Sequence, residues 1–313
     1  MASILDSVDQ RTKLVGQNRL EMLTFKLRGS QVFAINVFKV QEVQQLPNLN
    51  LLPKSDPVVV GVTTVRGKTI PVIDLSMAIG RSPIARDENS NIIVTEYNQS
   101  VQAFLVGSVD RIVNLKWDEI MPPPAAVGRN HYLTAITKLA DSIVEIIDVE
   151  KVLAQIVAFN TEVSPEMLDK DLYAYAQNLE VLLVDDSSIA IDQASATLQQ
   201  LGVKLIIETD GLKALTLLQR WRDEGINVPE KLLMVITDAE MPAMDGYRLT
   251  TEIRSDPALK DLFIVLHTSL SGSFNKAMVQ QVGCDDFLSK FQPDTLAKVV
   301  QEKIRQHMAN VND

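Results

Sequence analysis

The sequence predicts a multidomain chain, with an all-β N-terminal half followed by a doubly wound α/β C-terminal half. Its 313 residues exceed the usual size of one domain. Short β runs dominate residues 1–160, whereas strands and helices alternate after residue 180. Charge divides at the same place. Residues 1–160 hold 16 of the 30 Lys/Arg and 16 of the 40 Asp/Glu, which leaves the whole net charge of −10 to residues 161–313.

The composition excludes several classes of protein. No segment approaches the roughly 18 uninterrupted apolar residues that a membrane helix needs, so we expect no direct membrane insertion. One cysteine excludes an internal disulfide and fits a reducing cytoplasm. Three scattered histidines form no zinc motif. The acidic second half argues against nucleic acid as a partner.

The first half reads as a series of short strands separated by turns. Two alternating runs, 22–27 and 31–37, flank Gly29-Ser30 and predict a hairpin. Five further strands are expected at 58–64, 68–73, 91–96, 101–106 and 112–115, and short helices at 37–44, 74–79 and 149–156. Many short strands at this spacing indicate barrels or a sandwich.

Two sequence stretches give this half a family resemblance. They are Gly61-Val-Thr-Thr-Val-Arg-Gly-Lys-Thr-Ile-Pro-Val-Ile-Asp-Leu75 and Phe38-Lys-Val-Gln-Glu-Val43, with Ile120-Met-Pro-Pro-Pro further on. Together they resemble the CheW-like coupling domain of bacterial chemotaxis over residues 18–158. Thr64-Val65 stand where that family usually has Asn-Leu. The resemblance implies two SH3-like five-stranded barrels that bind the histidine kinase CheA and the cytoplasmic tips of chemoreceptors, without catalytic activity.

Partner binding is expected at Arg66, Gly67 and Glu42. The planar guanidinium of Arg66, placed between two strands, suits an interface. The residues alone favour a solvated turn arginine that is paired with a nearby carboxylate, whereas the resemblance favours a contact residue.

Residues 159–178 are polar and carry no clear strand pattern, so we expect a linker there. Within it, Ser164 and Pro165 predict a short helix, with the serine as its cap and the proline at its first position.

The second half, residues 179–310, alternates five strands with five helices. The strands are expected at 181–184, 203–207, 232–236, 263–266 and 287–288, and the helices at 188–201, 212–222, 247–255, 273–282 and 293–308. This alternation predicts a doubly wound, flavodoxin-like parallel sheet with strand order 2-1-3-4-5.

Three carboxylates end neighbouring strands of that sheet. Asp185 and Asp186 follow strand one, and Asp238 follows strand three. An Asp after a strand is by itself more often a helix cap or turn residue. Three carboxylates at one edge would repel each other, and a divalent cation such as Mg²⁺ would offset that repulsion. Thr268 and Lys290 end strands four and five at the same edge, a combination that caps do not explain.

The set suits phosphoryl transfer. Asp238 would act as the nucleophile, Mg²⁺ would bridge it to the phosphoryl oxygens, and Thr268 and Lys290 would contact the remaining oxygens.

These residues resemble the receiver domains of two-component signalling. The resemblance rests on Asp185-Asp186, on Asp238-Ala-Glu-Met-Pro-Ala-Met-Asp-Gly246, on Thr268-Ser269 and on Lys290. It implies that Asp238 is the phosphoacceptor and that Asp185, Asp186, Asp238 and the backbone carbonyl of Glu240 hold the metal. It also implies that Phe287 is the switch aromatic, which reorients with Thr268.

The sequence departs from the receiver pattern at two places. Phe291 replaces the usual proline after Lys290, which affects the cis peptide expected there. An insertion at 223–231 predicts a longer surface loop.

A coupling domain followed by a receiver is the architecture of the CheV family. It implies a cytoplasmic chemotaxis adaptor at receptor arrays on the inner face of the membrane, regulated at Asp238 to give adaptation or a phosphate sink. Two alternatives remain. An Mg²⁺-dependent aspartyl-phosphate phosphatase would typically carry a second Asp at position 240, where the chain has Glu240. A transcriptional response regulator would need a DNA-binding motif, and none is evident.

Overall fold

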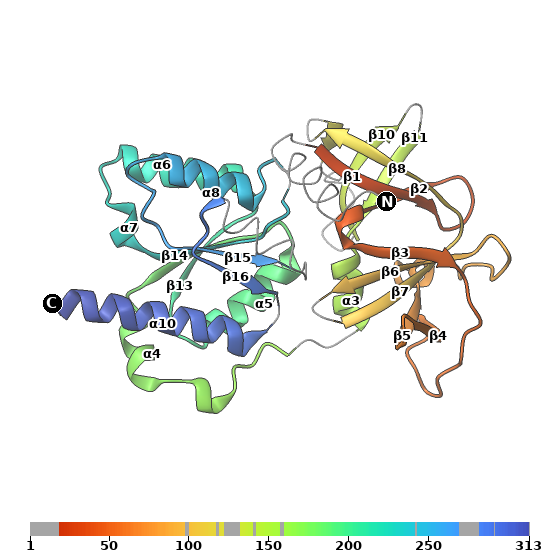
Figure 1. Cartoon of the computed structure of the whole chain (residues 1–313), viewed down its shortest axis with the longest axis horizontal. Helices are drawn as coiled ribbons and strands as arrows, with labels where there is room; N and C mark the ends of the chain where they lie inside the picture. The colour runs from red at the N-terminus through yellow and green to blue at the C-terminus, as the bar shows by residue number, and fades with distance from the viewer. Residues whose placement is uncertain are drawn as a thin grey trace, which may run out of the picture. The chain divides into compact units, whose positions relative to one another are not determined.

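The computed structural model describes residues 19–97, 100–116, 119–121, 132–139, 142–156, 160–241, 243–268, 282–290 and 292–312. The chain divides into two compact units (Figure 1). The first unit is residues 17–158, and the second contains residues 159–313. No described helix is long and apolar enough to cross a membrane.

The first sheet of the first unit joins strands from both ends of that unit. In spatial order its strands are β8 (Val109–Lys116), β1 (Arg19–Lys26), β2 (Val32–Asn36), β11 (Ser142–Ile147), β10 (Leu133–Leu139) and β9 (Ile120–Met121). The β2–β11 pair is parallel and the other pairs are antiparallel. The edge strands β8 and β9 are consecutive in the chain, so the sheet curls back towards itself.

The second sheet uses the intervening segment. Its order is β3 (Val40–Gln45), β6 (Asn91–Tyr97), β7 (Ser100–Val106), β5 (Lys68–Asp74) and β4 (Val59–Val65). Glu42 of edge strand β3 forms an ion pair with Arg66, which follows the opposite edge strand β4. This sheet is therefore also strongly curved. The all-β prediction is confirmed, with a sixth strand in the first sheet because the two-residue β9 pairs with β10.

Two helices of the first unit are as predicted. Helix α2 (Leu75–Ala78) begins at Asp74, whose carboxylate accepts a hydrogen bond from the Met77 N–H. Helix α3 (Val149–Ile156) has the predicted bounds.

The helix predicted at 37–44 is wrong. Only the 3-10 helix η1 (Val37–Lys39) forms there, and the chain continues as β3. Side chains of β3 alternate between half-buried and exposed, which is the two-residue period of an edge strand. Strands β9, β10 and β11 were not predicted. The Pro122-Pro-Pro part of the CheW-like motif lies outside the described residues.

The second unit is a five-stranded parallel sheet. Its order is β13 (Lys204–Glu208), β12 (Glu180–Val184), β14 (Leu232–Thr237), β15 (Ile264–Thr268) and β16 (Asp286–Ser289). This is the predicted order 2-1-3-4-5, with all pairs parallel. All six residues of β14 are buried, as expected of a central strand that is covered on both faces.

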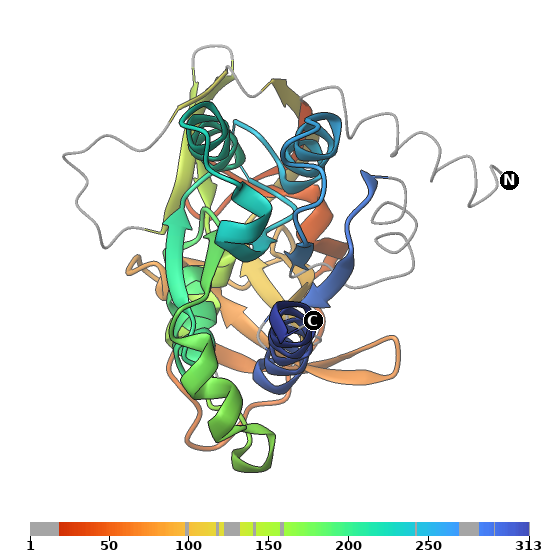
Figure 2. The same ribbon diagram turned by 90° about the vertical axis from the view of Figure 1, so that its left-hand side faces the viewer.

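Helices cover both faces of this sheet (Figures 1 and 2). On one face lie α6 (Gly211–Asp223), α7 (Val228–Lys231) and α8 (Gly246–Ser255), and on the other lie α5 (Ser188–Gln199) and α10 (Pro293–Asn312). The insertion at 223–231 was expected to be a surface loop, but its last four residues form α7. Val228 of α7 is buried in the core, which explains the helix. The helix predicted at 273–282 lies almost entirely outside the described residues.

The segment predicted as a linker contains regular structure. The 3-10 helix η4 (Pro165–Met167) and helix α4 (Lys170–Ala176) lie within it. Leu172 and Ala176 of α4 are buried in the core between α5 and α10. Ser164 precedes η4 as predicted, but its side chain forms no cap; it bonds to Asp294 instead.

Candidate functional site: an acidic cluster at the sheet edge

Asp238 lies at the carboxyl end of the central strand β14. Its N–H donates to the Val184 carbonyl at the end of β12, at 2.8 Å, so the two strand ends lie side by side. Its side chain is buried, with 7% of its surface exposed. The parallel sheet therefore holds this carboxylate at the edge where open α/β sheets bind ligands.

Carboxylates from two strands meet there. One oxygen each from Asp185, Asp186 and Asp238 lie within 4.8 Å of one another, and this is the one such acidic cluster among the described residues. Asp185 is 2% exposed, while Asp186 is half-buried. Asp185 Oδ1 also accepts from the Ser187 N–H at 3.0 Å, which fixes that side chain.

Lys290 bridges two of these acids. Its Nζ lies 2.8 Å from Asp185 Oδ2 and 3.1 Å from Asp238 Oδ1, and the residue is 1% exposed. Burial nevertheless raises the pKa of Asp185 to about 7, with the charge of Asp238 as a further contribution against the pull of Lys290. One ammonium does not fully compensate three crowded carboxylates.

Thr268 and His267 lie at the end of β15. Thr268 is buried, and its carbonyl accepts from the Lys290 N–H at 2.9 Å, so the Thr and Lys backbones are tied together. His267 is 2% exposed. Burial, and then the charge of Lys290, lower its pKa to about 3, so its imidazole is neutral at pH 7. Ser269 lies outside the described residues, as does the Lys290-Phe291 bond.

The loop after Asp238 depends on two glycines. A Cβ on Gly246 would lie 2.0 Å from the Asp238 carbonyl oxygen, and one on Gly211 would lie 2.4 Å from the Met244 carbonyl oxygen. Asp245 then caps α8 by accepting from the Arg248 N–H. Glycine lets the loop pass directly over the strand end, a role that the spacing alone did not reveal.

Two other predicted site residues, Phe287 and Glu240, lie on β16 and in the loop after β14. Phe287 is half-buried on β16 and packs against Ala239, Tyr247 and Leu266. Tyr247 in that small core was not predicted as part of the site. Glu240 is half-buried two residues after Asp238, in the same loop.

The donor set fits a magnesium ion. Three carboxylates with oxygens this close offer the hard ligands that Mg²⁺ prefers, and the residual negative charge favours a divalent cation. Asp185, Asp186 and Asp238 would hold it. The carbonyl of Glu240, two residues after Asp238, stays a predicted ligand.

The residues predicted for partner binding also meet. The Nε and Nη2 atoms of Arg66 donate to Glu42 Oε2 at 2.9 and 2.6 Å. Arg66 and Gly67 form a two-residue hairpin turn with φ of 49° and 78°, which resembles a type I′ turn. The Arg66 side chain remains 68% exposed, so Glu42 holds its guanidinium group in place while solvent still reaches it.

The comparisons with known proteins agree with this division. The CheW-like domain model matches residues 21–157, and the response regulator receiver domain model matches residues 181–301. The chemotaxis protein CheV1 of Helicobacter pylori is 29% identical over 96% of this chain and 98% of its own length. The chain therefore carries a CheW-like domain followed by a response regulator receiver domain, and it is similar to CheV proteins over nearly its whole length. Its first unit is the CheW-like domain and its second unit is the receiver domain.

Two further relatives support this. The chemotaxis protein CheV3 of Helicobacter pylori is 28% identical over 91% of this chain and 94% of its own length. The chemotaxis protein CheW of Klebsiella aerogenes is 30% identical over 46% of this chain and 87% of its own length. The second match spans one domain, whereas the CheV relatives span both.

Proposed function

We propose that the protein is a chemotaxis adaptor, which couples chemoreceptors to the histidine kinase CheA and is regulated by phosphorylation at Asp238. One observation carries the proposal: a buried Asp238 shares one sheet edge with Asp185, Asp186, Thr268 and Lys290. The CheW-like domain supplies the adaptor surface, around the exposed Arg66 and its partner Glu42.

In the reaction, an oxygen of Asp238 attacks the phosphorus of a phosphohistidine on the kinase. A P–O bond forms as the P–N bond breaks, and the imidazole nitrogen keeps the electron pair. Lys290, fixed between Asp185 and Asp238, offers its ammonium to the phosphoryl oxygens. Thr268, at the end of the neighbouring strand β15, would offer its hydroxyl to the same oxygens. A bound Mg²⁺ would neutralise charge and polarise the phosphoryl group.

The same residues limit the chemistry. Asp238 returns to its free form when water attacks the acyl phosphate, so the protein consumes one phosphoryl group per slow cycle. The pKa of His267, lowered to about 3, makes its imidazole a weak base that would do little to activate water for that step. We therefore infer a phosphoacceptor and scaffold rather than an enzyme that turns over free phosphoesters.

Label transfer tests the phosphoacceptor. Radiolabelled, phosphorylated CheA is mixed with the full chain and Mg²⁺, and we expect label on the wild type and none on Asp238→Ala. The matched control is Asp210→Asn, because Asp210 caps α6 by accepting from the Lys213 N–H and lies outside the acidic cluster. Equal labelling of the Asp238→Ala variant would reject the proposal.

A second measurement separates adaptation from a phosphate sink. A sink needs only the receiver domain, whereas adaptation needs both domains. In receptor arrays with CheA, we expect Arg66→Ala to abolish the phosphorylation-dependent change in kinase activity while label still reaches Asp238. If kinase activity in the arrays responds to phosphodonor identically with wild type and with Asp238→Ala, the regulatory part of the proposal fails.

A further inference from the structure

A segment outside the matched receiver domain is built into that domain. We call residues 160–176 the strap. The carbonyl of Thr161 accepts from Thr197 Oγ1 at 3.2 Å and from Gln200 Nε2 at 2.8 Å, and the Val163 N–H donates to Gln200 Oε1 at 3.0 Å. Val163 itself is 4% exposed, in the core between α5 and α10. The start of the strap is thereby fixed to α5.

The strap then follows α10 from its first turn towards its end. Ser164 donates its N–H to Asp294 Oδ1 at 2.7 Å and its hydroxyl to Asp294 Oδ2 at 2.6 Å. These two bonds hold the pKa of Asp294 below its usual value. Further along, Gln301 Nε2 donates to the Met167 carbonyl at 2.7 Å. The Tyr175 hydroxyl lies 2.9 Å from His307 Nδ1.

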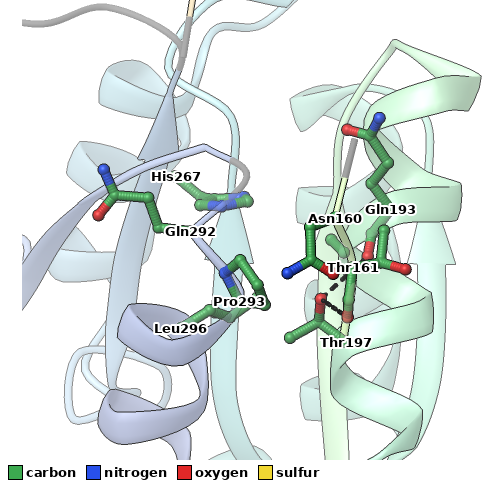
Figure 3. A pocket seen from close by; sticks show the side chains of 9 residues that line it. Asn160, Thr161, Gln193, Thr197, His267, Gln292, Pro293 and Leu296 are labelled. Carbon is green, nitrogen blue, oxygen red and sulfur yellow. Dashed lines mark hydrogen bonds between the residues drawn. The ribbon is translucent and has the colours of Figure 1, made fainter. Parts of the chain in front are cut away.

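The beginning of the strap lies beside the candidate site. A cavity of about 10 Å³ separates Asn160 and Thr161 from His267, Gln292 and Pro293 (Figure 3). His267 immediately precedes Thr268, and Gln292 follows Lys290 by two positions. A space of this size has room for about one water. The strap thus borders a small cavity on the side that faces His267, and hydrogen bonds to α5 and α10 hold it elsewhere.

We propose that the strap transmits the state of Asp238 to the segment that leads into the CheW-like domain. The inference rests on the proposed phosphorylation of Asp238. A phosphoryl group on Asp238 pulls Thr268 and Lys290 towards it. His267, next to Thr268, and Gln292, two positions after Lys290, then shift against Asn160 and Thr161. The nearest contacts that hold the strap are the bonds of Thr161 and Val163 to the end of α5 and the bonds of Ser164 to Asp294. These contacts loosen or tighten with that shift, while contacts near His307 stay unchanged.

Hydrogen exchange of the full chain tests this inference. Beryllofluoride with Mg²⁺ serves as the phosphoryl mimic, and peptides are followed with and without it. We expect a change of about threefold or more in the exchange rate of 160–168, together with changes in 264–268 and 286–290, and no change in 170–176. Changes confined to 264–268 and 286–290 would overturn the strap's role and leave the proposed function intact. If no peptide responds, the phosphoacceptor proposal fails first and the inference with it.

Two variants make the test independent of how well the mimic binds. Ser164→Ala removes the bond from the hydroxyl to Asp294 and should raise exchange of 160–168 about tenfold in both states. It should also abolish the phosphorylation-dependent change in kinase activity in receptor arrays, while label transfer to Asp238 remains. Tyr175→Phe, at the far end of the strap, is the control and should leave both readouts as in wild type. If kinase control is unchanged in Ser164→Ala despite faster exchange, the strap is only structural.

Discussion

Both domains bury carboxylates, but they surround them differently. In the CheW-like domain, Asp74 is 1% exposed and accepts from the Met77 and Ile84 N–H groups. In the receiver domain, Asp185 is 2% exposed, shares the ammonium of Lys290 with Asp238, and lies close to Asp186 as well. Asp74 caps a helix, and the two hydrogen bonds that it accepts stabilise its negative charge. The acids of the receiver domain instead leave an excess of negative charge at a sheet edge. The neighbours of a buried acid therefore distinguish a structural role from a chemical one.

The largest expected difference between the domains concerns the lysines that pair with buried acids. Lys290→Met leaves Asp185 and Asp238 buried without their cation, so we expect the receiver domain to lose about 3–5 kcal/mol of unfolding free energy. Lys39→Met in the CheW-like domain leaves Glu150, but Lys39 is 25% exposed and water reaches the pair, so the loss should be about 1–2 kcal/mol.

Tryptophan fluorescence can measure the two domains separately. The sequence has two tryptophans, Trp117 and Trp221, one in each domain. Denaturant unfolding in a Trp117→Phe background follows the receiver domain, and unfolding in a Trp221→Phe background follows the CheW-like domain. Equal losses for the two lysine variants would contradict the difference described above.

Alanine substitutions at two glycines, one in each domain, should also destabilise the domains to different extents, because the space around the two glycines differs. Gly246→Ala brings a Cβ against the Asp238 carbonyl, so we expect a loss of about 2–3 kcal/mol and weaker labelling of Asp238. Gly80→Ala has a positive φ of 78° but open space around it, and should cost only about 1 kcal/mol. The same two fluorescence backgrounds measure both changes, and intact labelling in Gly246→Ala would count against the importance of the loop.

Magnesium binding should depend on pH through Asp185. Its pKa, raised to about 7, means that the metal displaces a proton at lower pH. We expect Mg²⁺ affinity to rise by up to about tenfold per pH unit from pH 5 to 7 and then level off, as calorimetry can measure.

The stability of the metal-free receiver domain should depend on pH in the opposite direction. The folded chain keeps a proton that the unfolded chain has lost above its usual value of 3.8, so receiver stability falls as pH rises from about 4 to 7. The CheW-like domain should show no response to Mg²⁺.

The smallest effect on stability is expected at the exposed ion pair. Arg66→Ala should change the unfolding free energy of the CheW-like domain by less than about 1 kcal/mol, because the pair lies in water. Binding to CheA or receptor should nevertheless weaken about tenfold or more, as calorimetry or pull-down titration can show. Arg81, which is also exposed and lies 3.6 Å from Glu145, provides the control: Arg81→Ala should leave binding unchanged.

Sequence reasoning was most successful where strands are buried and parallel. The alternation of strands and helices predicted the sheet order, which the structure confirms. The residues that end those strands predicted the convergence of Asp185, Asp186, Asp238 and Lys290, whose side chains lie together in the structure. It failed at β3, because Val40 and Val43 lie three residues apart among Gln and Glu, a spacing typical of a helix. The alternating burial of the strand does not follow this pattern of polarity.

Two other features depend on contacts that sequence spacing does not reveal. Gly246 is explained by its approach to the Asp238 carbonyl, which becomes visible only when the loop is folded. The strap looks polar in sequence because its few apolar residues, among them Val163 and Leu172, are spaced irregularly. Their burial comes from packing against α5 and α10 rather than from a pattern of their own.

The strap also bears on how this receiver can be exchanged between proteins. A gene fusion that begins at residue 179 would lack Val163, Leu172 and Ala176. The apolar side chains of α5 and α10 that share a core with these residues would then be exposed to water. A fusion that begins near residue 160 would keep the strap, and with it the residues that bury these side chains. The unit that such a fusion should carry is therefore longer than the family match at residues 181–301.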